Sequence, residues 1–499
     1  MDIILISLSL TTLLAFMFLK SFLRQTTTTK LNPPPSAWRL PVIGNLHQLS
    51  LHPHRALCSL SHRYGPLMIL YFGRVPTLVV SSADTALDAL KTHDLKFSNR
   101  PVTKMVDKLL NSGRDLAFAP YGEYWRQVKS LCALNLFSKK TIQSFGYIRE
   151  EEITLMMDKL AKASYSSSTV NLSALLTTLT NDVITRVVLG RKYSGEEGGN
   201  NSNNIVRRFN ELLGTYPLGE FVPSLAWIDW IQGLDKKVEK VNKEIDVFLE
   251  KVVQEHEDAD QDMSAFVDIL LSTQKDKTTP FELDRAGLKI LLVELLFAGS
   301  ATTFTLMEWT MTELLRHPEC MKKLRDEILS VSKHNLYVSE KEVEKMNYLN
   351  MVIKEVLRLH PSGPLIPRLV SDDVKVNGYD IAAGTRVLIN LYAIQRDTAT
   401  WGPDAEKFRP ERHFDSSLDF EGQNFKYFPF GSGRRRCPGD GLALPLVELT
   451  LANLVKRFNL RFEGGPKGDN KPDLLEATGL DVCRKFPLIV SPFSATISL

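Results

Sequence analysis

The sequence has few cysteines, little net charge and no internal repeat. Five cysteines occur among 499 residues, at Cys58, Cys132, Cys320, Cys437 and Cys483. They are odd in number, scattered and never in a C-x-x-C pair, which argues against a disulfide framework or a structural zinc site and indicates a reducing compartment. The net charge of +3, from 61 basic and 58 acidic residues, argues against a general affinity for nucleic acid. Hydrophobic residues make up 43% of the chain, enough for a large core in one big domain or two.

One stretch near the N-terminus carries no charge. Residues 3–19, IILISLSLTTLLAFMFL, would span roughly 25 Å as a helix, and two further apolar residues with a snorkelling Lys20 extend it. A cleaved signal peptide is the competing interpretation, but no small-x-small cleavage site follows. Because basic residues follow the run, the sequence predicts a single transmembrane anchor over residues 1–23 with the rest of the chain in the cytosol.

The remaining chain divides into a hinge and a large domain. Residues 24–45 are polar and then proline-rich, which predicts a stiff connection, and residues 46–499 form the predicted domain. Strand composition occurs at residues 66–82, helical patterns dominate from about residue 84 to 360, and short strand-like runs follow Pro361. The predicted fold is therefore mainly α, with a small β region built from both ends of the chain.

A segment rich in aromatic residues interrupts the helical part. Residues 215–234 contain Tyr216, Phe221, Trp227 and Trp230. An ordinary core segment explains this composition, and so does a second contact with a membrane, because tryptophan and tyrosine favour the interface. The sequence leaves both interpretations open.

The cysteine-containing loop PFGSGRRRCPG, residues 429–439, has the properties of a metal-thiolate site. Three arginines and the N-terminus of a helix predicted to begin with Pro438 in its first turn would favour the thiolate form of Cys437. The glycines let the backbone approach something large and flat, and backbone amides could hydrogen-bond the sulfur. One thiolate with no second ligand nearby suits haem iron, whose other ligands come from a macrocycle. A buried structural cysteine is the alternative.

The complete string resembles the haem-binding signature of the cytochrome P450 family. It fits Phe-x-x-Gly-x-Arg-x-Cys-x-Gly at Phe430, Gly433, Arg435, Cys437 and Gly439, a highly specific pattern. The resemblance covers nearly the full length and is strongest to the plant A-type group in the seventy-one clan. KEVLRLHP and FRPERHF match the family's structural Glu–Arg network at Glu355, Arg358 and Arg412. YGEYWRQVK resembles the haem-propionate helix, with lysine where the family has arginine. The resemblance implies cofactor contacts from Cys437 (the axial iron ligand), Trp125, Lys129, Arg368, Arg435, Phe430, Gly431, Gly439, Ala298 and Gly299.

A long apolar helix beginning at Ala286 resembles the family's oxygen-binding helix. It implies a groove over the haem with Thr302 as the proton-relay alcohol and Thr303 beside it. The family's acid is missing, because Ala301 stands in its place. Glu294 and Glu308 lie seven residues to either side, ~10 Å away along the axis, so a water chain would be required for either to supply a proton. A helix kinked only for packing is the alternative, since threonine can bond back to the i−4 carbonyl.

The resemblance implies a haem b monooxygenase in the endoplasmic reticulum membrane, with its domain facing the cytosol. Electrons would come from NADPH through a partner reductase containing FAD and FMN. The basic wall of Arg434 to Arg436, with Arg126, could face that acidic partner, although the resemblance implies that a propionate occupies Arg435. Two other functions remain open: an oxygen-independent haem-thiolate dehydratase or isomerase, which Ala301 favours, and a non-catalytic haem-binding protein. The substrate would be a small lipophile of terpenoid or phenolic type, with lining candidates at Leu109, Phe118, Leu295, Leu296, Leu365 and Leu480.

Overall fold

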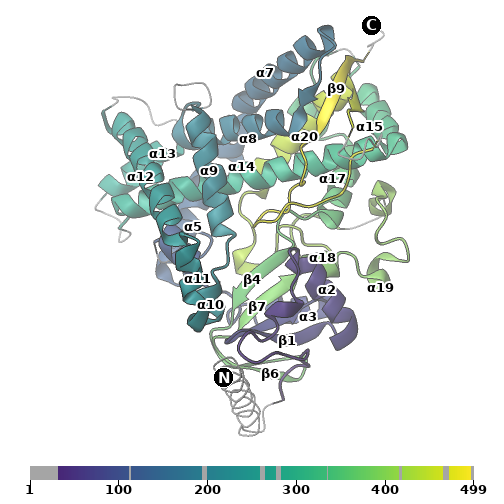
Figure 1. Ribbon diagram of the computed structural model, residues 1–499. Helices are drawn as coiled ribbons and strands as arrows, with labels where there is room; N and C mark the ends of the chain where they lie inside the picture. Colours follow the sequence, from purple (N-terminus) through teal and green to yellow (C-terminus); the bar gives the residue numbers. More distant parts are fainter. Residues whose placement is uncertain are drawn as a thin grey trace, which may run out of the picture. The chain divides into compact units, whose positions relative to one another are not determined.

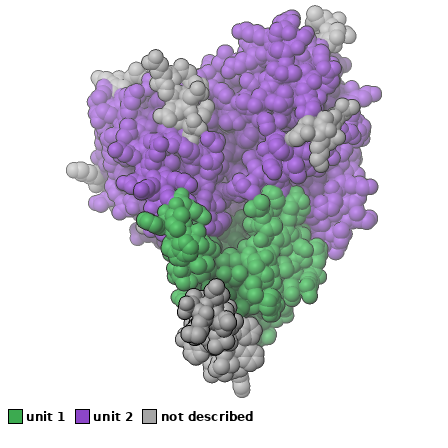
Figure 2. Space-filling model, in the orientation of Figure 1, with its two compact units in different colours: residues 1–101, 217–232, 365–393 green, residues 102–216, 233–364, 394–499 purple. Residues whose placement is uncertain are grey.

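The computed structural model describes residues 32–111, 114–193, 199–258, 265–276, 282–333, 335–414, 418–464 and 471–495 (Figure 1). The predicted anchor and the first part of the hinge lie outside these residues. The described chain is mainly helical with small sheets, as the sequence predicts. It divides into two compact units, shown in different colours in Figure 2: residues 1–101, 217–232 and 365–393 form unit 1, and residues 102–216, 233–364 and 394–499 form unit 2.

Unit 1 is built around a four-stranded sheet with the order β1-β2-β7-β4. The strands are β1 (Leu67–Phe72), β2 (Val75–Val80), β7 (Arg386–Asn390) and β4 (Leu365–Leu369). β1 and β2 form the antiparallel hairpin that residues 66–82 predict, whereas β2 and β7 pair in parallel with Val79 opposite Leu388. The antiparallel pair β5 (Val374–Val376) and β6 (Tyr379–Ile381) belongs to the same unit.

A turn at Gly73 joins β1 to β2 and admits a neighbouring chain segment. Its φ of 57° suits glycine, and a Cβ there would lie 2.0 Å from the carbonyl oxygen of Phe221. Phe221 ends α10 (Leu218–Phe221), and its side chain packs into the core of unit 1. The aromatic segment is therefore core at this residue.

The same segment exposes its two tryptophans. It continues through η3 (Pro223–Leu225) and α11 (Ala226–Ile231), where Trp227 is 58% and Trp230 76% exposed. The core interpretation thus holds at Phe221, and a membrane contact through the exposed Trp227 and Trp230 stays a prediction. Unit 1 also contains η1 (Leu46–Gln48), α2 (Pro53–Tyr64), α3 (Ala83–Leu87) and the π-helical turn Asp88–Thr92.

Unit 2 is organised around α14 (Arg285–Arg316), which has 32 residues and would extend ~48 Å. It begins where the Asp284 side chain accepts a hydrogen bond from Gly287 N at 2.8 Å, as N-cap residues do. Its principal neighbour is α8 (Leu172–Leu189), and α17 (Asn347–Leu359) and α20 (Asp440–Arg457) also contact it. Among the described residues, α8 and α14 are the helices long and apolar enough to cross a membrane. They are core helices here, because 61% and 67% of their apolar windows are buried.

The other elements of the described chain complete this helical core. A three-stranded sheet has the order β3 (Val170–Asn171), β9 (Ile489–Ser494) and β8 (Phe458–Phe462). α20 continues through Pro445 rather than ending there. The remaining helices are α4 (Lys104–Leu109), α5 (Glu123–Asn135), α6 (Lys139–Ser144), α7 (Gly146–Tyr165), α9 (Gly199–Leu213), α12 (Leu234–Asp258), α13 (Phe266–Lys275), α15 (Pro318–Val331), α16 (Glu340–Val343), α18 (Leu391–Ile394), α19 (Thr398–Trp401), η4 (Pro410–His413) and η5 (Gly433–Arg435).

Candidate functional site

The cysteine loop is closed by its own backbone. Cys437 N donates to Phe430 O at 2.9 Å, and the turn between them uses the left-handed conformation at Gly431 (φ 74°) and Gly433 (φ 71°). Both glycines are therefore required by the path of the chain. The Cys437 side chain is exposed, so the alternative of a buried structural cysteine is wrong.

Helix α20 begins directly after this loop. Its first residue is Asp440 and its N-cap is Gly439, so the prediction that Pro438 lies in the first turn is wrong. The Arg436 guanidinium binds the Asp440 carboxylate and donates to Phe420 O at 2.9 Å. This ion pair neutralises much of the charge on Arg436, so Arg436 contributes less positive potential at the sulfur than the sequence indicates.

The buried Arg435 joins the cysteine loop to the segment before α5. Its guanidinium donates to the carbonyl oxygens of Leu116 and Ala117 at 3.3 Å and to that of Ala119. It also stacks 4.3 Å from the centre of the Trp125 ring, at a distance typical of a cation–π contact.

The two predicted propionate partners on α5 lie at the same place. Trp125 Nε1 donates to Leu116 O at 2.9 Å, and Lys129 Nζ donates to Arg434 O at 2.7 Å. The structure thus brings Trp125, Lys129 and Arg435 together. Each of these side chains donates hydrogen bonds to backbone carbonyl oxygens. Arg368 belongs to unit 1, where it is buried on β4 and donates to Pro367 O at 2.9 Å.

The centre of α14 contains an accessible stretch in an otherwise buried part of the helix. Leu296 and Phe297 before it are buried, whereas Ala298 is exposed and the residues at 299, 301 and 302 are partly exposed. Thr302 Oγ1 donates to Ala298 O at 2.7 Å, the i−4 bond that the sequence predicts. Thr303, in contrast, is buried.

Gly299 has a packing role in this stretch. A Cβ at this position would lie 2.6 Å from Ile184 Cδ1 and 2.9 Å from Ile184 Cγ1. Because glycine has no side chain, α8 can approach α14 closely at this point. This packing explains why the helix contains a glycine, although glycine costs about 1 kcal/mol in helix propensity.

The two acids nearest Ala301 along the helix are used elsewhere. Glu294 Oε2 accepts from Leu116 N at 2.7 Å, which ties the segment before α5 to α14. Glu308 accepts from the Ser173 hydroxyl and from Arg484 N, and burial raises its pKa. Both carboxylates have structural partners, so neither replaces the missing acid directly.

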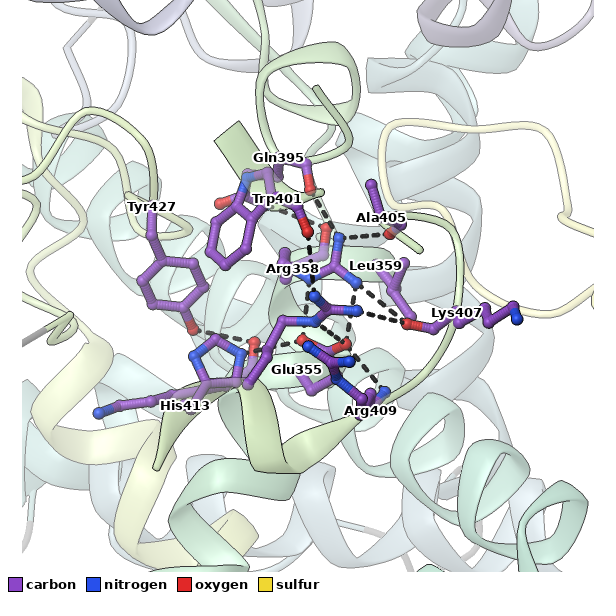
Figure 3. Close-up of polar contacts among 12 residues, drawn as sticks. Glu355, Arg358, Leu359, Gln395, Trp401, Ala405, Lys407, Arg409, His413 and Tyr427 are labelled. Atoms are coloured by element: carbon purple, nitrogen blue, oxygen red, sulfur yellow. Dashed lines mark hydrogen bonds and ion pairs between the residues drawn. The ribbon is translucent and has the colours of Figure 1, made fainter. Parts of the chain in front are cut away.

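The predicted Glu–Arg network surrounds Glu355 (Figure 3). Arg358 on the same helix binds this carboxylate through two bonds of 2.8 Å, and Arg412 Nε donates to Glu355 Oε1 at 2.8 Å. His413 Nε2 lies 2.9 Å from Glu355 Oε2. Burial alone raises the pKa of Glu355, but the hydrogen bonds from Arg358 and His413 lower it to about 2. Glu355 is therefore an anion at every physiological pH.

The network also includes hydrogen bonds to backbone carbonyl oxygens of the following segment, at Gln395 and Ala405 (Figure 3). Arg358 Nη1 donates to the carbonyl oxygens of Gln395 and Ala405 at 2.8 and 2.7 Å. The sequence interpretation missed His413 and Gln395. His413 directly follows Arg412 in FRPERHF, so its position was a usable signal, whereas Gln395 lies in no motif that singles it out.

The predicted substrate-lining residues differ in burial. Leu109, Leu295 and Leu296 are buried, and Phe118 and Leu480 are partly buried against the same core. Leu365 belongs to unit 1, where it packs on that unit's core. An open cleft of about 740 Å³ lies between α4, α12 and α14, and Leu109 is among its lining residues. Leu295, Leu296, Phe118 and Leu480 do not line it.

The donor set fits haem iron. An accessible thiol stands at the N-terminus of an 18-residue helix, whose dipole favours the thiolate. No group of three His, Cys, Asp or Glu side chains in the described part of the chain could hold a metal ion, so iron bound by Cys437 needs the further ligands of a macrocycle.

Comparisons with known proteins agree with this assignment. Residues 33–482 match the family described as Cytochrome P450. Cytochrome P450 71A16 of Arabidopsis thaliana is 61% identical over 496 residues, which cover 99% of each chain. The indoleacetaldoxime dehydratase of the same plant is 60% identical over 491 residues, which cover 98% of each chain. A solved zebra fish cytochrome P450 structure with abiraterone has a TM-score of 0.74 at 25% identity, and the match covers 89% of this chain and 100% of that chain.

Proposed function

Because this chain belongs to the cytochrome P450 family of haem monooxygenases, we propose that it inserts one oxygen atom of O2 into a small lipophilic specialised metabolite of a plant. Its electrons would come from NADPH through a flavin reductase. The observation that carries the proposal is the cysteine loop, which holds an accessible Cys437 at the start of α20. Haem bound through a cysteine thiolate supplies dioxygen activation.

The chain's own residues would hold and orient the reactants. Cys437 would hold the haem iron through its thiolate, and the bond from its N–H to Phe430 O fixes the loop that presents the sulfur. Arg435 and Trp125 form a cationic, aromatic wall beside the loop and would contact the propionates. The Thr302 hydroxyl, whose hydrogen is directed at Ala298 O, keeps its oxygen lone pairs available to accept from a water.

A second candidate function is an oxygen-independent dehydratase or isomerase. Ala301 removes the carboxylate that would assist proton delivery during oxygen activation, and Glu294 and Glu308 do not replace it. The similarity to a relative named indoleacetaldoxime dehydratase also supports this candidate.

The experiment that separates the two is product formation by the reconstituted enzyme with reductase and NADPH, under air and under argon. A monooxygenase forms product only under air and incorporates label from ¹⁸O₂. Equal yields in both atmospheres would exclude the monooxygenase and leave the dehydratase or isomerase.

We further propose that the protein is anchored in the endoplasmic reticulum membrane through residues 1–23 and touches it again through Trp227 and Trp230. Aromatic side chains at these exposures suit the membrane interface. A chain without residues 1–23 should still bind to vesicles. In that truncated chain, the double substitution Trp227→Ser with Trp230→Ser should abolish the remaining binding. Unchanged binding of the truncated double variant would exclude the second contact.

The partner reductase would meet an exposed basic surface. Arg434 and Arg126 are exposed, whereas Arg435 is buried and Arg436 is paired with Asp440. Arg434 and Arg126 are therefore the two predicted arginines that remain as candidates for long-range attraction of an acidic partner. Arg434→Ala with Arg126→Ala should raise the KM for reductase and reduce its salt dependence.

A further inference from the structure

We propose that Asn210 and Asp481 form a polar pair that selects substrates carrying an N–H or O–H donor on an otherwise apolar skeleton. This inference rests on the proposed function and specifies its substrate class. It concerns two residues that no motif identifies, one in α9 and one near the C-terminus of the chain.

The pair connects two closely packed segments of unit 2. Asn210 Nδ2 donates to Asp481 Oδ2 at 3.1 Å. Four residues after Asn210, a Cβ at Gly214 would lie 2.8 Å from Leu480 N, so the end of α9 approaches the chain before Asp481 as closely as glycine allows. The positions of both polar side chains are therefore set by backbone packing.

The pair leaves a buried acceptor. An ionised carboxylate can only accept, so it directs the amide nitrogen of Asn210 toward itself and leaves Asn210 Oδ1 for another donor. Asn210 Oδ1 is buried, and among the described residues none donates to it. Burial also raises the pKa of Asp481 to about 6, which marks apolar surroundings. An unmatched acceptor in such surroundings costs free energy that a donor on a ligand would recover.

Two chains of contacts connect this pair to the accessible stretch of α14. The Phe209 ring, beside Asn210 in sequence, meets the Phe297 ring edge-on with centroids 5.6 Å apart. Val482 N, beside Asp481, donates to Ser362 O at 2.9 Å, and Ser362 Oγ donates to Thr302 O at 3.3 Å. The neighbour of Asn210 in sequence thus contacts the start of the 297–302 segment. The neighbour of Asp481 is connected to the end of that segment through Ser362.

The surroundings indicate a neutral ligand. The segment's predicted lining residue, Leu480, is partly buried against the hydrophobic core, and Leu295 and Leu296 on α14 are buried in that core. A charged group would lose its hydration there, whereas a neutral donor would lose little and would satisfy Asn210 Oδ1. Indolic N–H, oxime O–H and phenolic O–H groups have this chemistry.

The test compares two probes that differ by one donor. Indole and 1-methylindole are titrated into the purified holoenzyme, and binding is measured from the shift of the haem absorption band. We expect the wild-type chain to bind indole roughly 5- to 150-fold more tightly, the range that corresponds to satisfying one buried acceptor. Asn210→Leu removes the acceptor, and Asp481→Asn provides an amide N–H that can donate to Asn210 Oδ1. Each substitution should bring the ratio close to one.

The control is Asp326→Asn, which makes the same change of charge at an exposed residue of α15 and should keep the wild-type ratio. Every variant is first checked for the thiolate-type spectrum of its reduced, carbon monoxide-bound haem. Equal binding of both probes by a wild-type chain with that spectrum, or a preference retained in both Asn210→Leu and Asp481→Asn, would overturn the pair. A wild-type chain without the spectrum would instead overturn the proposed function.

Discussion

Replacing Glu355 by glutamine tests whether the buried network stabilises the fold. The substitution keeps the shape of the side chain but removes the negative charge between Arg358, Arg412 and His413. The two arginines would then be buried cations without a carboxylate. Leaving a buried charge uncompensated in this way costs about 3–5 kcal/mol of stability. We therefore expect a large loss of stability rather than the small effect of a surface pair.

The pKa of Glu355 gives an independent magnitude. A pKa of about 2, against 4.5 for an ordinary glutamate, corresponds to about 3 kcal/mol of stability at neutral pH. Because this pKa is lowered, the stabilisation is fully present above pH 4.5 and is lost as the pH falls toward 2. For a unit as large as unit 2, this loss of folding free energy should lower the thermal midpoint by roughly 4 °C.

The assay is thermal unfolding at pH 7, followed by haem absorbance and by far-ultraviolet circular dichroism. Glu319→Gln is the control, because Glu319 is exposed on α15. A midpoint for Glu355→Gln within 1 °C of the control would refute the stabilising role. Retention of the wild-type acid sensitivity between pH 4.5 and 3 would refute the pKa argument.

Three further predictions concern the cysteine loop and α14. Cys437→Ser should lose the thiolate-type carbon monoxide spectrum, and a variant that keeps it would disprove the ligand assignment. Ala301→Asp should raise the ratio of product formed to NADPH consumed, and Thr302→Ala should lower it, because a general acid typically contributes 10²–10⁴-fold; unchanged ratios in both variants would remove this segment from proton delivery. Gly299→Ala should lower the thermal midpoint, since the new Cβ meets Ile184, and adding Ile184→Val should restore part of it; a midpoint equal to or above that of the wild type would show that helix propensity outweighs the packing.

The motifs predicted which side chains donate hydrogen bonds better than they predicted which atoms accept them. Glu355 and Arg358 are three residues apart on one helix, so their contact follows from helical geometry. Arg412 and Trp125 were placed by resemblance alone. The acceptor of the Trp125 N–H is Leu116 O, and the path of a loop cannot be read from one sequence.

Contacts between distant segments could not be predicted for the same reason. Gly299 looks like a defect in a helix when only its own helix is considered, and its purpose depends on Ile184, 115 residues earlier in the sequence. The pair Asn210–Asp481 joins residues 271 positions apart. Hydrophobic periodicity shows that a helix is buried, but not which side chain of another helix lies against a given turn.

The parallel pairing of β2 with β7 affects how the chain is synthesised. About 300 residues separate Val80 from Arg386, and most of unit 2's helices, though not α20, lie between them in the sequence. At 5–20 residues per second, the ribosome needs roughly 15 to 60 s to deliver β7 after β2 has emerged. During that interval one edge of the apolar β1–β2 hairpin has no partner strand, and unpaired edges of this kind are sites of aggregation. Expression of this protein should therefore depend on chaperones that bind the nascent N-terminal segment early, and lower temperature should help only if it slows aggregation more than it slows elongation.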